Sequence, residues 1–89
     1  MLHARKDYQR IQDPEGKIPE DEPVFLLRAQ DVCAPFIVLE WAHRAGMHGA
    51  ANNIVNAARS QAERMRQWQR EHGMKVPDLP GGDKCRNSR

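Results

Sequence analysis

The sequence predicts a mainly α fold, α+β at most: a helical hairpin with one short strand and extended N- and C-terminal arms. Two segments, 35–45 and about 50–72, carry helical periodicity and are joined by a short glycine-containing connection. One apolar run at 24–29 directly follows a proline, as a short strand can. The flanking stretches are rich in proline, glycine and charge, which favours extended arms.

The chain has 89 residues, which is short enough for one domain. We place that domain at 1–80 and a disordered tail at 81–89. A chain of this length buries only about 60 % of its unfolded surface, so small proteins often gain buried area by forming oligomers. Cys33 and Cys85 form no disulfide or zinc pattern, and we expect free thiols in a reducing cytosol. We also expect no signal peptide and no membrane span, because no apolar run is long enough.

The N-terminal arm contains a turn and an acidic segment. Residues 1–7 are polar, and we expect them to be frayed. Asp13, Pro14 and Gly16 take the first, second and fourth positions of a type I turn. Residues 13–22 then hold five acids against one lysine. Prolines on both sides keep the acids Glu20, Asp21 and Glu22 extended, and we expect them to form an acidic edge on the surface.

The strand candidate is Val24–Ala29, which is apolar on both faces and therefore expected to be covered on both. A strand needs a neighbour for its backbone groups. That neighbour can be Tyr8–Gln12, Met74–Leu79, or a second copy of the strand across a two-fold axis. We favour a partner within the chain, because extended segments that follow each other in sequence tend to lie adjacent.

The first helix can begin in two ways. Asp31 is a candidate N-cap, whereas Pro35 is well suited to be the first helical residue. The segment 35–45 is apolar around most of its circumference and leaves only a narrow polar strip, so we expect burial on more than one side. Gly46 is a candidate end of the helix.

The second helix is expected from about Ala50 to His72, with Gly73 as its end. Steps of three and four residues define a packing seam with one polar interruption, at Gln61. Its members are small at the start and large at the end: Ala51, Ile54, Ala58, Gln61, Met65, Trp68 and His72.

Charged residues gather on one side of this helix, where Arg59, Glu63, Arg66 and Arg70 follow steps of four, three and four. The arginines can follow a nucleic-acid backbone. Alternatively, they form a solvated face with pairing along the helix, or they meet the acidic segment 13–22. We favour the second interpretation, because Glu63 interrupts the stripe and acids are available.

The sequence lacks the patterns that carry common chemistry. It has no phosphate-binding loop, and Cys33 and His43 stand about 15 Å apart along one helix, too far for a nucleophile pair. We expect Cys33 to be a core thiol and the two tryptophans to be core residues rather than base-stacking platforms. The histidines lie too far apart along the hairpin to share a zinc ion. We therefore expect no enzyme, no cofactor and no metal.

Three stretches, "DYQRIQDP", "EDEPVFLLRAQD" and "KVPDLP", occur in this order around two helices that contain Trp41 and "QAERMRQWQ". This arrangement, from Asp7 to about Pro80, resembles a family of small uncharacterised proteins encoded by tailed bacteriophages and prophages. The resemblance carries no catalytic residue. It implies a location in the bacterial host cytoplasm and an accessory role.

The expected function is non-enzymatic protein binding, as a phage accessory or host-takeover factor, including inhibition of host defence machinery. The alternatives are a nucleic-acid-binding module that uses the basic face of the second helix, and a small virion or assembly component. We expect a homodimer with a host or phage protein as its partner, and no membrane. The candidate partner-binding residues are Glu20, Asp21, Glu22, Arg59, Arg66 and Arg70.

Overall fold

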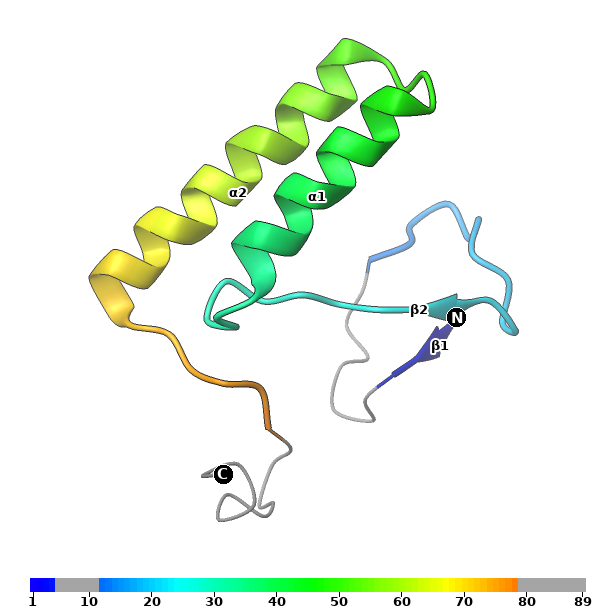
Figure 1. Ribbon diagram of the computed structural model, residues 1–89. Coiled ribbons are helices and arrows are strands. Elements are labelled where there is room, and N and C mark those ends of the chain that lie inside the picture. The colour runs from blue at the N-terminus through cyan, green and yellow to red at the C-terminus, as the bar shows by residue number, and fades with distance from the viewer. Residues whose placement is uncertain (5–11, 79–89) are drawn as a thin grey trace.

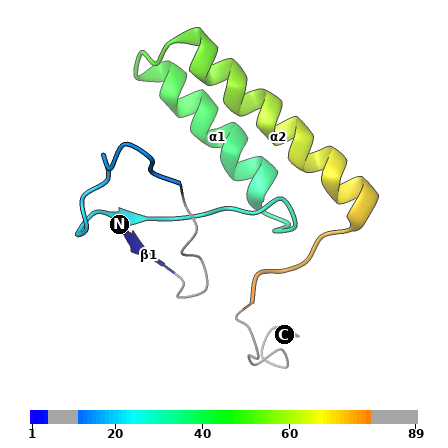
Figure 2. The ribbon, with the colours of Figure 1, turned by 180° about the vertical axis from the view of Figure 1, so that it is seen from behind.

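The computed structural model describes residues 1–4 and 12–78 (Figure 1). In chain order its elements are β1 (Leu2–His3), β2 (Pro23–Val24), α1 (Ala34–Met47) and α2 (Asn52–His72). The two helices pack side by side as a hairpin, which confirms the predicted fold class. The β1–β2 pair lies beside α1, on the side away from α2 in both views (Figures 1 and 2). The expected tail at 81–89 and Cys85 lie outside the described residues.

Helix α1 begins at Ala34, with Pro35 in its first turn and Cys33 as the N-cap residue. The prediction of Asp31 as N-cap is therefore wrong. The Asp31 carboxylate instead accepts a hydrogen bond of 2.8 Å from the backbone N–H of Cys33, which shapes the turn before the helix. The helix continues through Gly46 to Met47, so the predicted end was one residue too early.

Glycines mark the two remaining helix boundaries. Gly49, in the connection, has φ = 90°, and the N–H of Ala50 reaches back to the carbonyl of Ala45 at 2.9 Å. Helix α2 ends at His72, as predicted. Gly73 follows with φ = 89°, a conformation that side chains with a Cβ disfavour, and its N–H donates to the carbonyl of Gln69 at 2.8 Å.

The interface between the helices contains small side chains. The buried residues of the described chain are Ala34, Pro35, Ala42, Val55 and Ala62. Alanines let two helix backbones approach closely, and a Cβ added at Gly46 would be in ordinary van der Waals contact with Val55 Cγ2, at 3.8 Å. The hydrophobic core is consequently thin.

The predicted seam of α2 is rotated relative to the observed one. Val55 and Ala62 are buried, whereas Ile54 and Gln61, which precede them by one residue, are exposed. The reason is size, because the close approach of the helices leaves room for valine and alanine but not for a row of larger residues. Burial of α1 on more than one side is also wrong, since four of its large apolar side chains are at least half exposed: Phe36, Ile37, Trp41 and Met47.

Hydrogen bonds join the segments at the base of the hairpin, and we call the two made by the Gln69 side chain the latch. Gln69 Nε2 donates to the carbonyls of Ala29 and Asp31, at 2.8 and 3.0 Å. Beside it, a parallel bridge pairs Asp31 with Lys75 through two backbone hydrogen bonds, of 2.8 and 3.0 Å. The segment before α1 is thereby tied both to the last turn of α2 and to the residues that follow it.

The predicted strand Val24–Ala29 is wrong beyond its first residue. Strand β2 covers only Pro23–Val24 and pairs in parallel with β1, with Leu2 opposite Pro23 and His3 opposite Val24. The preference for a partner within the chain is confirmed, but that partner lies in the stretch expected to be frayed. Of the two other candidates within the chain, Tyr8–Gln12 lies outside the described residues except for Gln12. In Met74–Leu79, the backbone of Lys75 instead forms hydrogen bonds with Gln30 and Val32. A ladder can be no longer than its shorter strand, and β1 is two residues long.

The predicted turn in the N-terminal arm is confirmed. The N–H of Gly16 donates to the carbonyl of Asp13 at 3.0 Å, and Gly16 adopts φ = 64°. The Asp13 carboxylate also accepts hydrogen bonds of 3.0 Å from the backbone N–H groups of Lys17 and Ile18. These hydrogen bonds, with Ile18 the largest contributor, hold the pKa of Asp13 below its ordinary value.

Candidate functional site

Large apolar side chains are concentrated on the surface of this protein rather than in its core. Among the described residues, ten large apolar side chains are between 38 % and 73 % exposed, and each side chain that is buried there is small. Contiguous exposed apolar surface marks interaction sites in soluble proteins. The exposed residues are Leu2, Phe25, Phe36, Ile37, Trp41, Met47, Ile54, Trp68, Met74 and Val76.

Trp41, Ile54 and Gln61 each directly precede a residue buried between the helices: Ala42, Val55 and Ala62. In two antiparallel helices, one step back from the interface turns to the same side of the pair, and we call this side the helix face. On α1, Ile37 and Trp41 are four residues apart and 50 % and 51 % exposed. On α2, Ile54 and Trp68 are 50 % and 38 % exposed and lie on one line along the helix with Gln61, at intervals of seven residues. The helix face comprises Ile37, Trp41, Ile54, Gln61, Met65 and Trp68.

The opposite side of the hairpin has a different character. There the guanidinium of Arg66 lies 5.3 Å from the centre of the Phe36 ring, a cation–π contact between the two helices. A charged pair also lies on the outer surface of α1, where Arg44 Nε donates to Glu40 Oε2 at 2.7 Å. The cation–π contact thus lies away from the helix face, whereas Arg44 stands seven residues after Ile37 and therefore on its line along α1.

No other part of the described chain covers the helix face. In both views, the remaining segments lie beside α1 or beyond the helix ends, and none crosses the two helices (Figures 1 and 2). The face is therefore available to a partner outside this chain.

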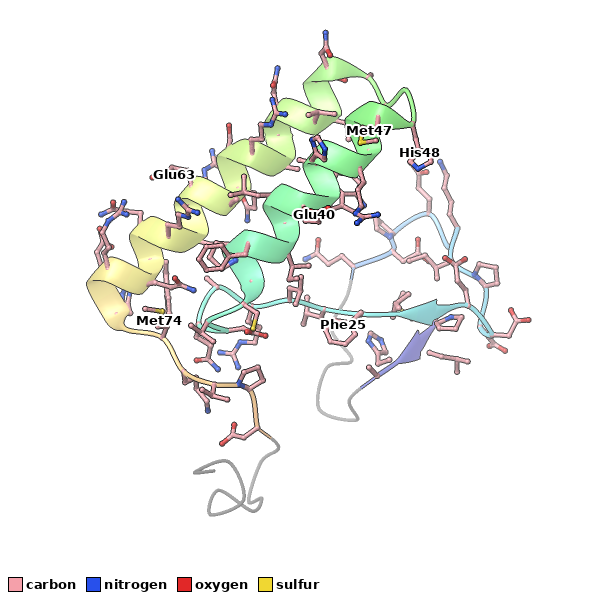
Figure 3. All side chains as sticks on the ribbon, viewed as in Figure 1. Phe25, Glu40, Met47, His48, Glu63 and Met74 are labelled. Carbon is pink, nitrogen blue, oxygen red and sulfur yellow. The ribbon has the colours of Figure 1, made fainter. Side chains whose placement is uncertain are left out.

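A second apolar surface lies on the N-terminal arm. An open depression of about 420 Å³, which we call the arm groove, is lined by Leu2, His3, Ala4, Pro23, Val24 and Phe25. Phe25 is 69 % exposed and projects from the segment between β2 and α1 (Figure 3). The expectation that both faces of this segment are covered is wrong, because Phe25 is exposed and the sheet in the described residues has two strands.

The acidic edge borders this groove. Glu20, Asp21 and Glu22 directly precede β2 and are all exposed, as predicted. Among the described residues, no ion pair joins them to the arginines of α2. Helix α1 stands between the arm and α2 in both views, so the acids and those arginines form separate surfaces (Figures 1 and 2).

The three candidate arginines are partly engaged within the helices. Arg66 is half-buried over the Phe36 ring, and Arg70 Nη2 lies 3.6 Å from Glu63 Oε2 and also donates to Gln67. Arg59 is exposed. Pairing along the helix accords with the solvated-face interpretation rather than with a continuous cationic stripe.

Several other expectations about single residues are wrong. Cys33 is an exposed free thiol at the start of α1 rather than a core thiol. Trp41 is half exposed, and Trp68 stacks on His72 with ring centres 4.3 Å apart and an interplanar angle of 21°. The tryptophans thus belong to the helix face and not to a core. The signal that pointed to this face was the apolar circumference of α1, whereas nothing in the sequence pointed to the arm groove.

The described residues hold no candidate metal centre, since no three His, Cys, Asp or Glu side chains converge. None of the helices in the described ranges has the length and apolar character that crossing a membrane requires.

Comparisons with protein-family models, with curated proteins and with solved structures find no match to this chain. The physical character of the two apolar surfaces is therefore what indicates a function.

Proposed function

We propose that this protein is a non-enzymatic protein-binding module. The observation that carries the proposal is the distribution of apolar side chains: in the part of the chain that the structure describes, five small residues are buried and ten large ones are exposed. Aromatic side chains are enriched where proteins bind one another, and both tryptophans and both phenylalanines of this chain are at least 38 % exposed.

The arm groove and the acidic edge together suit a partner that carries both apolar and basic side chains. Phe25 and Leu2 offer apolar contact in the groove, and Glu20, Asp21 and Glu22 supply negative charge at its border. Surface charge of one sign steers a partner of the opposite sign and disfavours other partners. We therefore assign the partner site to the arm groove and the acidic edge, and we expect a Lys- or Arg-rich protein segment to bind there.

The biological setting is proposed from the resemblance to small phage proteins. In this setting, the protein acts in the bacterial host cytoplasm as an accessory or host-takeover factor. Its partner is then a host or phage protein, including a component of host defence machinery.

Nucleic acid is a less favoured partner, because Arg66 and Arg70 already contact Phe36 and Glu63 within the hairpin. A nucleic-acid-binding module would show an affinity that falls steeply with salt. A virion or assembly component would co-purify with particles.

The proposal is tested by affinity capture from a bacterial host lysate. Phe25→Ala removes the apolar anchor, and the triple change Glu20→Gln, Asp21→Asn and Glu22→Gln removes the edge charge. Met47→Ala is the matched control, because Met47 is 73 % exposed but lies at the far end of α1 (Figure 3).

We expect a specific protein that the wild type and the Met47→Ala variant retain and that Phe25→Ala loses at least tenfold. The triple variant should bind more slowly and with less salt dependence. Equal capture by all four proteins, or capture of nucleic acid alone, would overturn the assignment.

A further inference from the structure

We propose that the helix face binds a second copy of this chain, with α2 packed antiparallel on its own copy about a two-fold axis at Gln61. The inference rests on the proposed protein-binding function but concerns a different surface from the arm groove. The occupant follows from three properties of the helix face: its area, its symmetry and its polar centre.

The exposed apolar area of the helix face is appropriate for a dimer of small subunits. Trp41 and Trp68 are 51 % and 38 % exposed, which leaves each about 100 Å² to bury. Ile37 and Ile54, each 50 % exposed, add comparable areas. These four side chains provide on the order of half of the roughly 800 Å² that each partner buries in a standard interface.

A second copy also supplies what the thin core lacks. Over residues 1–4 and 12–78 the core holds five small residues, and chains of this size commonly complete their apolar burial by association. A closed two-fold dimer covers the same face on both copies at once.

The line of residues along α2 is symmetric about its centre. Ile54 and Trp68 stand seven residues on either side of Gln61, so each lies about 10 Å from it along the helix. A two-fold axis at Gln61 therefore places Ile54 of each copy opposite Trp68 of the other. The larger side chain meets the smaller one at both ends, and the packing is self-complementary.

Gln61 itself suits a position opposite its own copy. Its amide carries both a donor and an acceptor, so two copies can pair reciprocally, which no carboxylate or ammonium group can do with itself. In the single chain, Gln61 Oε1 accepts a hydrogen bond of 3.3 Å from Arg64 Nη1. A single polar residue in an apolar seam is a known means of fixing helix register.

The same symmetry brings no like charges together. Arg64 is the charged residue beside the line, and the two-fold relation places it opposite Ala58 of the second copy. Along the α2 line, the two-fold relation therefore places no charged residue opposite a like charge.

The inference is tested by sedimentation equilibrium of the purified full chain with charge-swap variants at the axis. Gln61→Glu and Gln61→Lys each place two like charges opposite one another, although Gln61 is exposed in the single chain and its replacement leaves the core intact. Asn56→Glu is the matched control, because Asn56 is an exposed amide on another side of α2. Circular dichroism confirms that each variant folds.

We expect wild type and Asn56→Glu to dimerise, and Gln61→Glu and Gln61→Lys each to raise the dissociation constant at least tenfold. An equimolar mixture of the two charged variants should dimerise again, because opposite charges then meet at the axis.

A wild type that stays monomeric at high micromolar concentration would overturn the second copy as occupant and leave the arm-groove test unaffected. A dimer that neither charged variant weakens, or a mixture that fails to recover, would overturn the axis at Gln61.

Discussion

Replacing Gln69 by alanine should open the base of the hairpin. Gln69 is half-buried, and its Nε2 donates to two backbone carbonyls, those of Ala29 and Asp31, at 2.8 and 3.0 Å. A hydrogen bond contributes about 0.5–1.5 kcal/mol net, so the loss of two predicts a destabilisation of about 1–3 kcal/mol. For a domain of this length, each kcal/mol corresponds to a fall of about 4–8 °C in Tm.

The effect can be measured by urea denaturation at one fixed protein concentration, followed by tryptophan fluorescence. Gln67→Ala is the matched control, because Gln67 is an exposed glutamine on the same helix whose amide bonds exposed side chains of that helix, those of Glu71 and Arg70. The control should change the free energy of unfolding by less than about 0.5 kcal/mol. Equal effects of the two substitutions would refute the latch.

Two further substitutions test the packing of the core and the turn at Asp13 in the N-terminal arm. Ala62→Leu should destabilise the hairpin by about 1–3 kcal/mol in the same denaturation assay, because Ala62 is only 1 % exposed between the helices, whereas Ala57→Leu on the exposed side should change little. The lowered pKa of Asp13 stabilises the folded state above the ordinary pKa of an aspartate, and this stabilisation is lost as the pH falls through the lowered value. The difference in Tm between wild type and Asp13→Asn should therefore shrink towards acid pH, and a difference independent of pH would contradict the hydrogen bonds to Asp13.

The helices and turns were predictable from the sequence because their signals are local. The turn follows from Asp13, Pro14 and Gly16, and the end of α2 follows from Gly73. Such residues act through their own backbone conformation and need no distant partner. The acidic edge was predictable for a similar reason, since three adjacent acids remain in water wherever the chain leads them.

Pairing and burial were not predictable in the same way, because they depend on distant segments. β2 pairs with Leu2–His3, a choice that no local pattern specifies. The seam of α2 was displaced because Ala58 and Met65 fit both the predicted stripe and the observed one, and only the close approach of α1 selects Val55 and Ala62. The latch depends on contacts that span about 40 positions in sequence, which periodicity does not reveal.

The candidate surfaces show the same division. The excess of apolar residues on α1 indicated that most of its sides pack against other residues. The sequence did not show that the described chain leaves part of this apolar surface exposed. The arm groove arises only when β1 and β2 come together.

The exposure of the helix face can be measured through its two tryptophans, Trp41 and Trp68, which are the only tryptophans in the chain. Acrylamide quenching of their fluorescence, recorded across a dilution series, reports whether a partner copy covers them. We predict weak quenching at high protein concentration and strong quenching after dilution, with the Gln61→Glu variant strongly quenched throughout. Strong quenching of the wild type at every concentration would contradict the binding of a second copy at the helix face.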